Sequence, residues 1–207
     1  VAVSSSQKLQ SGMLRACNLH LGRRAAQATS VFRRAHRGLA VSVGDDIAVP
    51  DVKLQAARNW DDGVADGFKS TTLEDLFKGK KLAVFAVPGA YTGVCSNAHV
   101  PSFVENANAI KAKGVDQIVC VSVNDPYTMA AWGSNFSTEV TFFGDSDASF
   151  AEFMGQALDL NVAALGPGKR SNRFSMVVDD GKVVSLNVEE APADLKVSDG
   201  ATLLASL

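Results

Sequence analysis

The residues best suited to chemistry gather in one stretch, Val87-Pro88-Gly89-Ala90-Tyr91-Thr92-Gly93-Val94-Cys95-Ser96. It follows the apolar run 82–87, which predicts a buried strand that the Pro-Gly pair brings to an end. Apolar residues at helical spacing come next, so the sequence predicts a helix over 96–113. Cys95 therefore stands where a loop enters a helix. The free amide groups and the dipole of a helix N-terminus favour the thiolate, which is the reactive form of cysteine.

The residues around Cys95 are compatible with a metal site, a hydrolase or a redox site, and also with a Cys95 that is only a buried core residue. Thr92 lies within reach of the Cys95 sulfur and of a substrate, and His99, four residues after Cys95, shares its helix face. A metal site would need two further ligands, of which the chain after its first 40 residues offers only Cys120. A Cys–His hydrolase would need an orienting group that the sequence does not identify. Redox chemistry needs only an accessible thiolate, donors around the substrate and a second thiol.

Cys120 is the candidate for that second thiol. It falls in the run 117–123, whose β-branched residues predict a buried parallel strand, so it also fits the role of a core residue. A bond between Cys95 and Cys120 needs Cα atoms within about 7 Å, and we expect the helix to unwind locally for that. No C-x-x-C pair occurs, which argues against an ordinary dithiol exchange catalyst.

The surrounding elements predict an α/β fold with a mixed central sheet flanked by helices. A strand–helix–strand unit over 82–123 makes the centre of the sheet parallel. Two apolar strands, 173–178 and 182–188, flank an Asp-Gly turn and predict an antiparallel hairpin at one edge. Shorter strands and helices are expected at 51–59, 68–72, 73–78, 127–135, 140–143, 148–158 and 198–207.

The start of the chain differs in composition from the rest. Residues 1–44 hold no acidic residue but seven basic ones: Lys8, Arg15, Arg23, Arg24, Arg33, Arg34 and Arg37. The rest of the chain then has 13 basic and 22 acidic residues, a formal charge of −9 against −2 for the whole. An Arg-rich, Ser-rich segment without acids is typical of an organellar transit peptide. We therefore assign residues 1–40 to a leader and 41–207 to one domain; the alternative is a disordered basic tail that binds nucleic acid or a membrane surface.

Length and composition limit the class of protein. The predicted domain is long enough for a sizeable core, and no apolar run approaches the roughly 20 residues of a membrane span. Three cysteines, one of them Cys17 in the predicted leader, are too few for a disulfide scaffold. The sequence therefore predicts a globular domain for a reducing compartment.

Three motifs resemble those of the peroxiredoxins, specifically the type II or peroxiredoxin-5-like subfamily and its plant and algal members. They are the stretch 87–96 with His99-Val100-Pro101, the run Cys120-Val121-Ser122-Val123-Asn124-Asp125-Pro126, and Arg173-Phe174-Ser175-Met176-Val177-Val178-Asp179-Asp180-Gly181. The resemblance spans residues 41–207. It implies a thioredoxin-like fold and the reduction of hydrogen peroxide and alkyl hydroperoxides without a metal, haem or flavin.

By position, the resemblance implies a role for each of five residues. Cys95 resembles the peroxidatic cysteine, and Cys120 resembles the resolving cysteine. Thr92 resembles the threonine that hydrogen-bonds the sulfur and the peroxide. Pro88 resembles the proline that shields the pocket, and Arg173 the arginine that activates the thiolate and polarises the peroxide.

The resemblance also implies partners and a destination. We expect a hydroperoxide substrate, electrons from glutaredoxin with glutathione or from thioredoxin, and a homodimer, with no nucleic acid and no membrane. The plant and algal resemblance favours the chloroplast, with the mitochondrion as the alternative. Tyr91 and Gly93 depart from the family pattern of Phe and Pro, which we expect to loosen the loop or shift substrate preference. The alternative function is a non-catalytic thioredoxin-fold binding or chaperone module.

Overall fold

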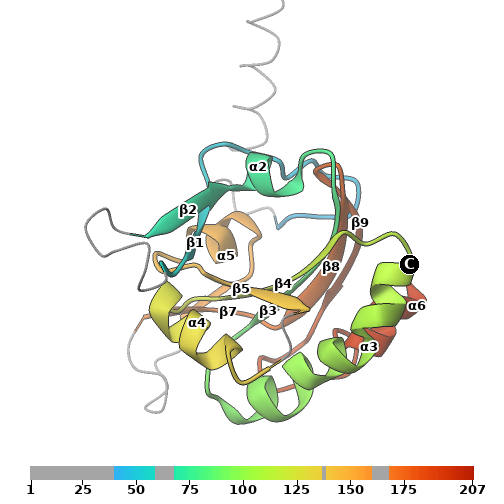
Figure 1. Ribbon diagram of the computed structural model, residues 1–207. Helices are drawn as coiled ribbons and strands as arrows, with labels where there is room; N and C mark the ends of the chain where they lie inside the picture. The colour runs from blue at the N-terminus through green and yellow to red at the C-terminus, as the bar shows by residue number, and fades with distance from the viewer. Residues whose placement is uncertain (1–39, 59–67, 137–138, 160–167) are drawn as a thin grey trace, which may run out of the picture.

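A seven-stranded mixed sheet forms the centre of the molecule, with strands in the order β2-β1-β5-β4-β3-β8-β9 (Figure 1). The computed structural model describes residues 40–58, 68–136, 139–159 and 168–207. β3 (Lys81–Val87), β4 (Gln117–Ser122) and β5 (Val140–Gly144) are parallel to one another. β8 (Phe174–Asp179) and β9 (Lys182–Val188) form a hairpin that continues the sheet antiparallel to β3, which confirms the predicted mixed architecture.

The opposite edge of the sheet is a short antiparallel pair. β1 (Lys53–Ala56) pairs with β2 (Lys69–Thr72) and meets β5 at a single residue pair. β2 leads directly into α2 (Leu73–Phe77), and Thr72 is the N-cap of this helix. The Thr72 hydroxyl accepts the N–H of Asp75 at 3.0 Å, which satisfies a free amide at the start of the helix.

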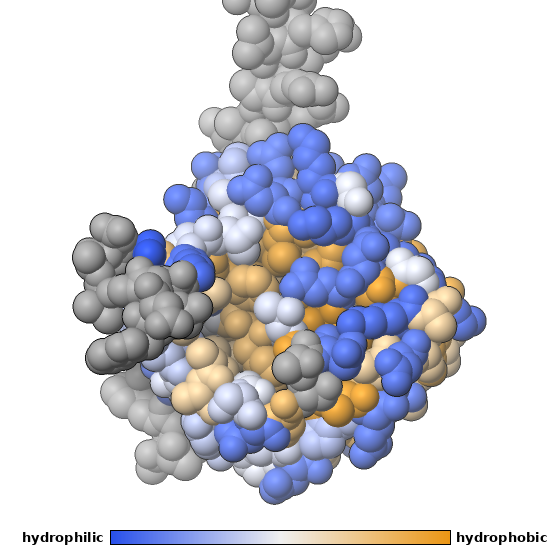
Figure 2. All heavy atoms as spheres, viewed as in Figure 1, coloured by the Kyte–Doolittle hydropathy of each residue, from blue (hydrophilic) through white to orange (hydrophobic). Residues whose placement is uncertain are grey.

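Helices cover both faces of the sheet. α3 (Val100–Ala112), α4 (Pro126–Gly133) and α6 (Gly200–Ala205) pack on one face and share one apolar cluster. α2 and α5 (Ser149–Phe153) contribute to the cluster on the other face. On the side shown in Figure 2, apolar residues gather at the centre, over the strands between α2 and α3, and hydrophilic residues surround them.

Both cysteines of the described chain lie on the same face of the sheet. In β3, the side chains of Ala83, Phe85 and Val87 point toward the layer of α3, α4 and α6. Cys120 pairs in register with Phe85, and its side chain lies in the same cluster. Cys95 packs into that cluster as well. The two thiols therefore face one apolar layer, although they come from different elements.

The end of the chain is held against the start of α3. The Gly200 N–H donates to Ser102 Oγ at 2.9 Å, and the Ser102 hydroxyl donates to His99 O at 2.7 Å. A Cβ on Gly200 would lie 2.3 Å from Ser102 O, so this close approach needs glycine. The C-terminal segment is thus tied to the helical turn that carries Cys95.

One predicted helix is shorter in the structure. The sequence predicted a helix over 148–158, but α5 ends at Phe153, and Gly155 then adopts a left-handed φ of 69°. The chain continues as β6 (Ala157–Asp159), which pairs with β7 (Lys169–Ser171). β6 and β7 have three residues each, ALD and KRS, which is too short for an alternation of apolar and polar residues to indicate a strand.

The predicted leader lies outside the described residues, except for Ala40. Within the described part of the chain, none of the helices has the length and apolar character needed to cross a membrane.

Candidate active site

The loop after β3 is fastened to the end of β4. Pro88 and Gly89 are buried, and the Ala90 N–H donates to Asn124 Oδ1 at 3.0 Å. The same oxygen accepts the Ser122 hydroxyl at 2.8 Å, which orients the Asn124 amide. These bonds position the loop that leads to Cys95.

Thr92 ends this loop and begins the helix. Its hydroxyl donates to Gly89 O at 2.8 Å, and its carbonyl accepts the N–H of Ser96 at 2.9 Å. The hydroxyl proton is thus engaged by the backbone, whereas the oxygen lone pairs can still accept a hydrogen bond. In this arrangement the Thr92 hydroxyl donates to the backbone and not to the Cys95 sulfur.

Cys95 opens a π-helical turn, η1 (Cys95–His99), that continues into α3. The sequence predicted that the helix begins just after Cys95. In the structure two helical residues precede Cys95, which therefore lies in the first turn of the helix. The Val100 N–H bonds to Cys95 O, five residues back. Pro101 has no N–H and cannot bond to the carbonyl four residues back, which is a physical reason for the wide turn at this position.

One charged group reaches the buried Cys95 sulfur. The side chains of Cys95 and Arg173 are each 1% exposed, and Arg173 Nη2 lies 3.4 Å from Cys95 Sγ as a hydrogen-bond donor. Arg173 Nε and Nη2 also donate to Pro192 O at 3.2 and 2.9 Å, and Nη1 donates to His99 Nδ1 at 3.0 Å. A guanidinium stays protonated in proteins, so this contact stabilises negative charge on the sulfur in a site with little water.

His99 is neutral, has a defined tautomer and accepts a hydrogen bond from Arg173. Burial, together with the charge of Arg173, lowers the pKa of His99 to about 3. Because Nδ1 accepts from Arg173, the ring hydrogen is on Nε2, which donates to Ser198 O at 2.9 Å. Neither nitrogen is left to take a proton from Cys95, which argues against the Cys–His hydrolase. The sequence placed His99 beside Cys95 but had no signal for its contact with an arginine 74 residues away.

We expect acid to destabilise the protein partly through His99. Its ordinary pKa is 6.5 and its folded-state pKa about 3, so between these values the unfolded state binds more protons and stability falls as pH falls. A change from about pH 7.5 to about pH 5.5 should cost about 1.4 kcal/mol through this group. Urea unfolding of the wild type and of His99→Gln at both pH values measures this difference.

His99→Gln is needed as the reference because a second buried group, Asp145, also changes the stability of the protein with pH. Burial raises the pKa of Asp145 from 3.8 to about 6, although its carboxylate accepts the N–H groups of Phe150 and Ala151. Its contribution to stability is present at low pH and is lost as pH rises through about 6, which opposes the effect of His99. An equal acid-induced loss in the wild type and His99→Gln would contradict a neutral, buried His99.

Cys120 lies in the middle of β4, in register with Phe85 of β3 and Phe142 of β5. Burial raises the pKa of Cys120 well above its ordinary value, the nearby Cys95 raises it further, and Arg173 acts in the opposite direction. Cys120 is therefore a protonated core thiol in this conformation. Both thiols are free.

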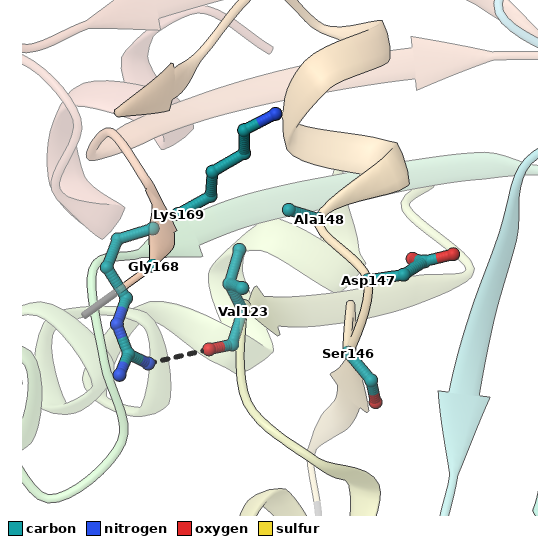
Figure 3. A pocket seen from close by; sticks show the side chains of 7 residues that line it. Val123, Ser146, Asp147, Ala148, Gly168 and Lys169 are labelled. Atoms are coloured by element: carbon teal, nitrogen blue, oxygen red, sulfur yellow. Dashed lines mark hydrogen bonds between the residues drawn. The ribbon is translucent and has the colours of Figure 1, made fainter. Parts of the chain in front are cut away.

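A separate pocket of about 350 Å³ lies beside the end of β4 (Figure 3). Arg170 Nη1 donates to Val123 O at 2.7 Å across it, and Lys169 forms an ion pair with Glu152. Arg170 thus anchors β7 to β4. The pocket is lined by Val123, Ser146, Asp147, Ala148, Gly168, Lys169 and Arg170.

The described residues offer no cluster of three or more His, Cys, Asp or Glu side chains that could hold a metal ion. What the structure brings together is Cys95, Arg173 and His99, with Cys120 on the same face of the sheet. A buried thiol in contact with a cation is suited to attack on a small, electrophilic substrate.

Comparisons with known proteins agree with this chemistry. The family model described as Redoxin matches residues 42–204. The chain is 50% identical over 182 residues to "Peroxiredoxin-2F, mitochondrial" of Oryza sativa subsp. japonica, which covers 86% of this chain and 91% of that protein. It is 44% identical over 199 residues to the Arabidopsis thaliana protein of the same name, with coverage of 94% and 98%. The solved structure of reduced Prx3 in complex with H2O2 from Vibrio vulnificus is 38% identical, with a TM-score of 0.71 and coverage of 80% and 98%.

The predicted chloroplast destination is wrong. The relatives at 50% and 44% identity are both named mitochondrial, whereas the Arabidopsis thaliana relative named "Peroxiredoxin-2E, chloroplastic" is 39% identical. The composition of the predicted leader could not separate the two organelles, because Arg-rich segments without acidic residues are typical of both destinations.

Proposed function

Since this chain belongs to the Redoxin family and is a type II peroxiredoxin, a thiol peroxidase, we propose that Cys95 is its peroxidatic cysteine. We assign Arg173, Thr92 and Pro88 to the same site. The observation that carries the proposal is the hydrogen bond from Arg173 Nη2 to the buried Cys95 sulfur. The enzyme reduces hydrogen peroxide and alkyl hydroperoxides through a cysteine sulfenic acid.

In the first step, the Cys95 thiolate attacks the terminal oxygen of the hydroperoxide, and the O–O bond breaks. The sulfur becomes a sulfenic acid, and the other oxygen leaves as alkoxide or hydroxide and takes up a proton from solvent. Arg173 donates to the oxygens on which negative charge develops. Thr92 accepts the O–H of the incoming peroxide, which is supported by the donation of its own proton to Gly89 O.

Pro88 contributes an apolar wall to the site. It is buried directly after β3 and has no N–H, so it offers the peroxide no competing donor. Restricting water around the sulfur strengthens the attraction between the thiolate and Arg173.

We propose Cys120 as the resolving cysteine. Its thiol attacks the sulfenic sulfur of Cys95, an S–S bond forms, and the sulfenic oxygen leaves as water with the thiol proton. The shared apolar cluster supports this pairing. Because Cys120 is buried and protonated, the step requires η1 to open first.

Mass spectrometry after one equivalent of peroxide tests this step. We expect the wild type to lose two hydrogen atoms in mass and to yield a peptide pair joined through Cys95 and Cys120. Cys120→Ser should instead hold a sulfenic acid on Cys95, which glutathione converts to a mixed disulfide. A wild type that stops at the sulfenic acid and reacts with glutathione as fast as Cys120→Ser would exclude Cys120 from the cycle.

We further propose the donor, the assembly and the destination. The oxidised enzyme is reduced by glutaredoxin with glutathione or by thioredoxin; steady-state peroxide consumption with each donor alone distinguishes them. We propose a homodimer, which sedimentation measures. We propose that residues 1–40 are a mitochondrial targeting leader for the domain 41–207, supported by the names of the two relatives. Import of the full chain into isolated mitochondria tests that assignment.

A further inference from the structure

The C-terminal segment, and not a carboxylate, holds Arg173 in place. Pro192 O accepts from both Nε and Nη2 of Arg173. Ser198 O accepts from His99, which in turn accepts from Arg173 Nη1. Two carbonyls of the loop 192–198 thus set the orientation of the guanidinium that reaches Cys95. This loop is remote in sequence from the strand and helix that carry the cysteine.

Glu189 is the anchor of that loop. Its Oε1 accepts the N–H groups of Lys196, Val197 and Ser198 at 2.8, 2.9 and 2.9 Å and the Ser198 hydroxyl at 2.8 Å. The side chain is 3% exposed. Burial acts to raise the pKa of Glu189, but these four hydrogen bonds outweigh it and lower the pKa, so the carboxylate is ionised.

Glu189 also stands opposite Arg173 in the sheet. Its N–H donates to Arg173 O at 3.0 Å, which extends the pairing of β8 and β9 by one residue. Cross-strand neighbours of opposite charge ordinarily pair. In the described part of the chain no ion pair joins these two side chains, because the amides of 196–198 surround the carboxylate. Arg173 is left with neutral acceptors, and its charge is available to the sulfur.

We propose that Glu189 is a positioning residue for the peroxidase reaction: it anchors the loop 192–198, whose carbonyls hold Arg173 and His99 against Cys95. The carboxylate acts through the loop and touches neither the sulfur nor the substrate. This inference rests on the proposed roles of Cys95 and Arg173. It predicts that replacing Glu189 lowers the reactivity of the Cys95 sulfur, although Glu189 does not contact that sulfur.

The test compares Glu189→Ala and Glu189→Gln with Glu190→Gln, the exposed neighbour. Stopped-flow kinetics gives the rate constant for the reduced protein with hydrogen peroxide, and iodoacetamide gives the pH profile of Cys95 alkylation. Glu189→Ala should react about 100-fold more slowly, as misplaced catalytic groups do, with the alkylation midpoint moved to higher pH. Glu189→Gln, which keeps an acceptor oxygen, should lose less. Glu190→Gln should stay within about twofold of the wild type.

A double-mutant cycle separates positioning from general destabilisation. If Glu189 acts through Arg173, Glu189→Ala should change the rate less than about threefold in an Arg173→Gln background. An unchanged rate and alkylation profile in Glu189→Ala, or the same fold-loss in both backgrounds, would overturn the inference. If Glu189→Ala does not fold, the same cycle with Glu189→Gln decides. If Arg173→Gln reacts with hydrogen peroxide at the same rate constant as the wild type, the proposed active site itself is overturned, and not only the role of Glu189.

Discussion

Replacing Cys95 by serine should abolish hydroperoxide reduction, with a loss of more than about 10⁴-fold, as removal of a catalytic nucleophile commonly causes. The thiolate is the nucleophile, and a serine hydroxyl stays protonated even beside Arg173. Serine differs from cysteine only in its γ atom, so the substitution is nearly isosteric at this buried position and the fold should persist. Peroxide consumption with a thiol donor, measured together with the melting temperature, gives the result.

Cys120→Ser is the matched control for this experiment. It removes the other described thiol from the same apolar cluster, but the first reaction with peroxide does not use it. After one equivalent of peroxide, dimedone should label Cys120→Ser on Cys95 and leave Cys95→Ser unlabelled. Activity retained by Cys95→Ser at the wild-type level would exclude Cys95 as the reacting group.

Replacing Arg173 by glutamine should lower the rate constant with hydrogen peroxide by about 10²–10³-fold, the usual cost of losing a preorganised donor to a developing charge. Glutamine removes the cation that contacts the sulfur at 3.4 Å. Alkylation of Cys95 at neutral pH should slow in parallel, because less of the sulfur is ionised. Arg173→Lys should not restore the wild-type rate, because an ammonium cannot reach Pro192 O, His99 and the sulfur at once.

Arg170→Gln is the control for Arg173→Gln, since Arg170 is close in sequence but donates to Val123 O beside another pocket. Its rate constant with peroxide should stay near that of the wild type. Arg173→Gln also leaves buried acceptors without donors, which should cost about 1–3 kcal/mol of stability. Both variants are therefore compared below their melting temperatures. A normal alkylation rate in folded Arg173→Gln would contradict the proposed activation of Cys95.

Local patterns in the chain were enough to predict the framework of strands and helices. Apolar runs and the Asp-Gly turn predicted β3, β4, β8 and β9, because strand alternation and turn chemistry act over only a few residues. The same local pattern placed Cys95 at the start of a helix. Motif resemblance then indicated the family. The short strands β6 and β7 escaped prediction, because their pairing joins segments that are individually ambiguous.

The contacts that hold the site together became visible only in the folded molecule. The contact between Arg173 and Cys95 spans 78 residues, and the neutral tautomer of His99 depends on partners that come from two other parts of the chain. Thr92 directs its proton to Gly89 O, and Glu189 is surrounded by loop amides although Arg173 is its cross-strand neighbour. Sequence patterns report which residues lie on one face of an element. The direction of a hydrogen bond and the partner of a buried charge depend on sheet register and loop conformation, which form only when distant segments pack together.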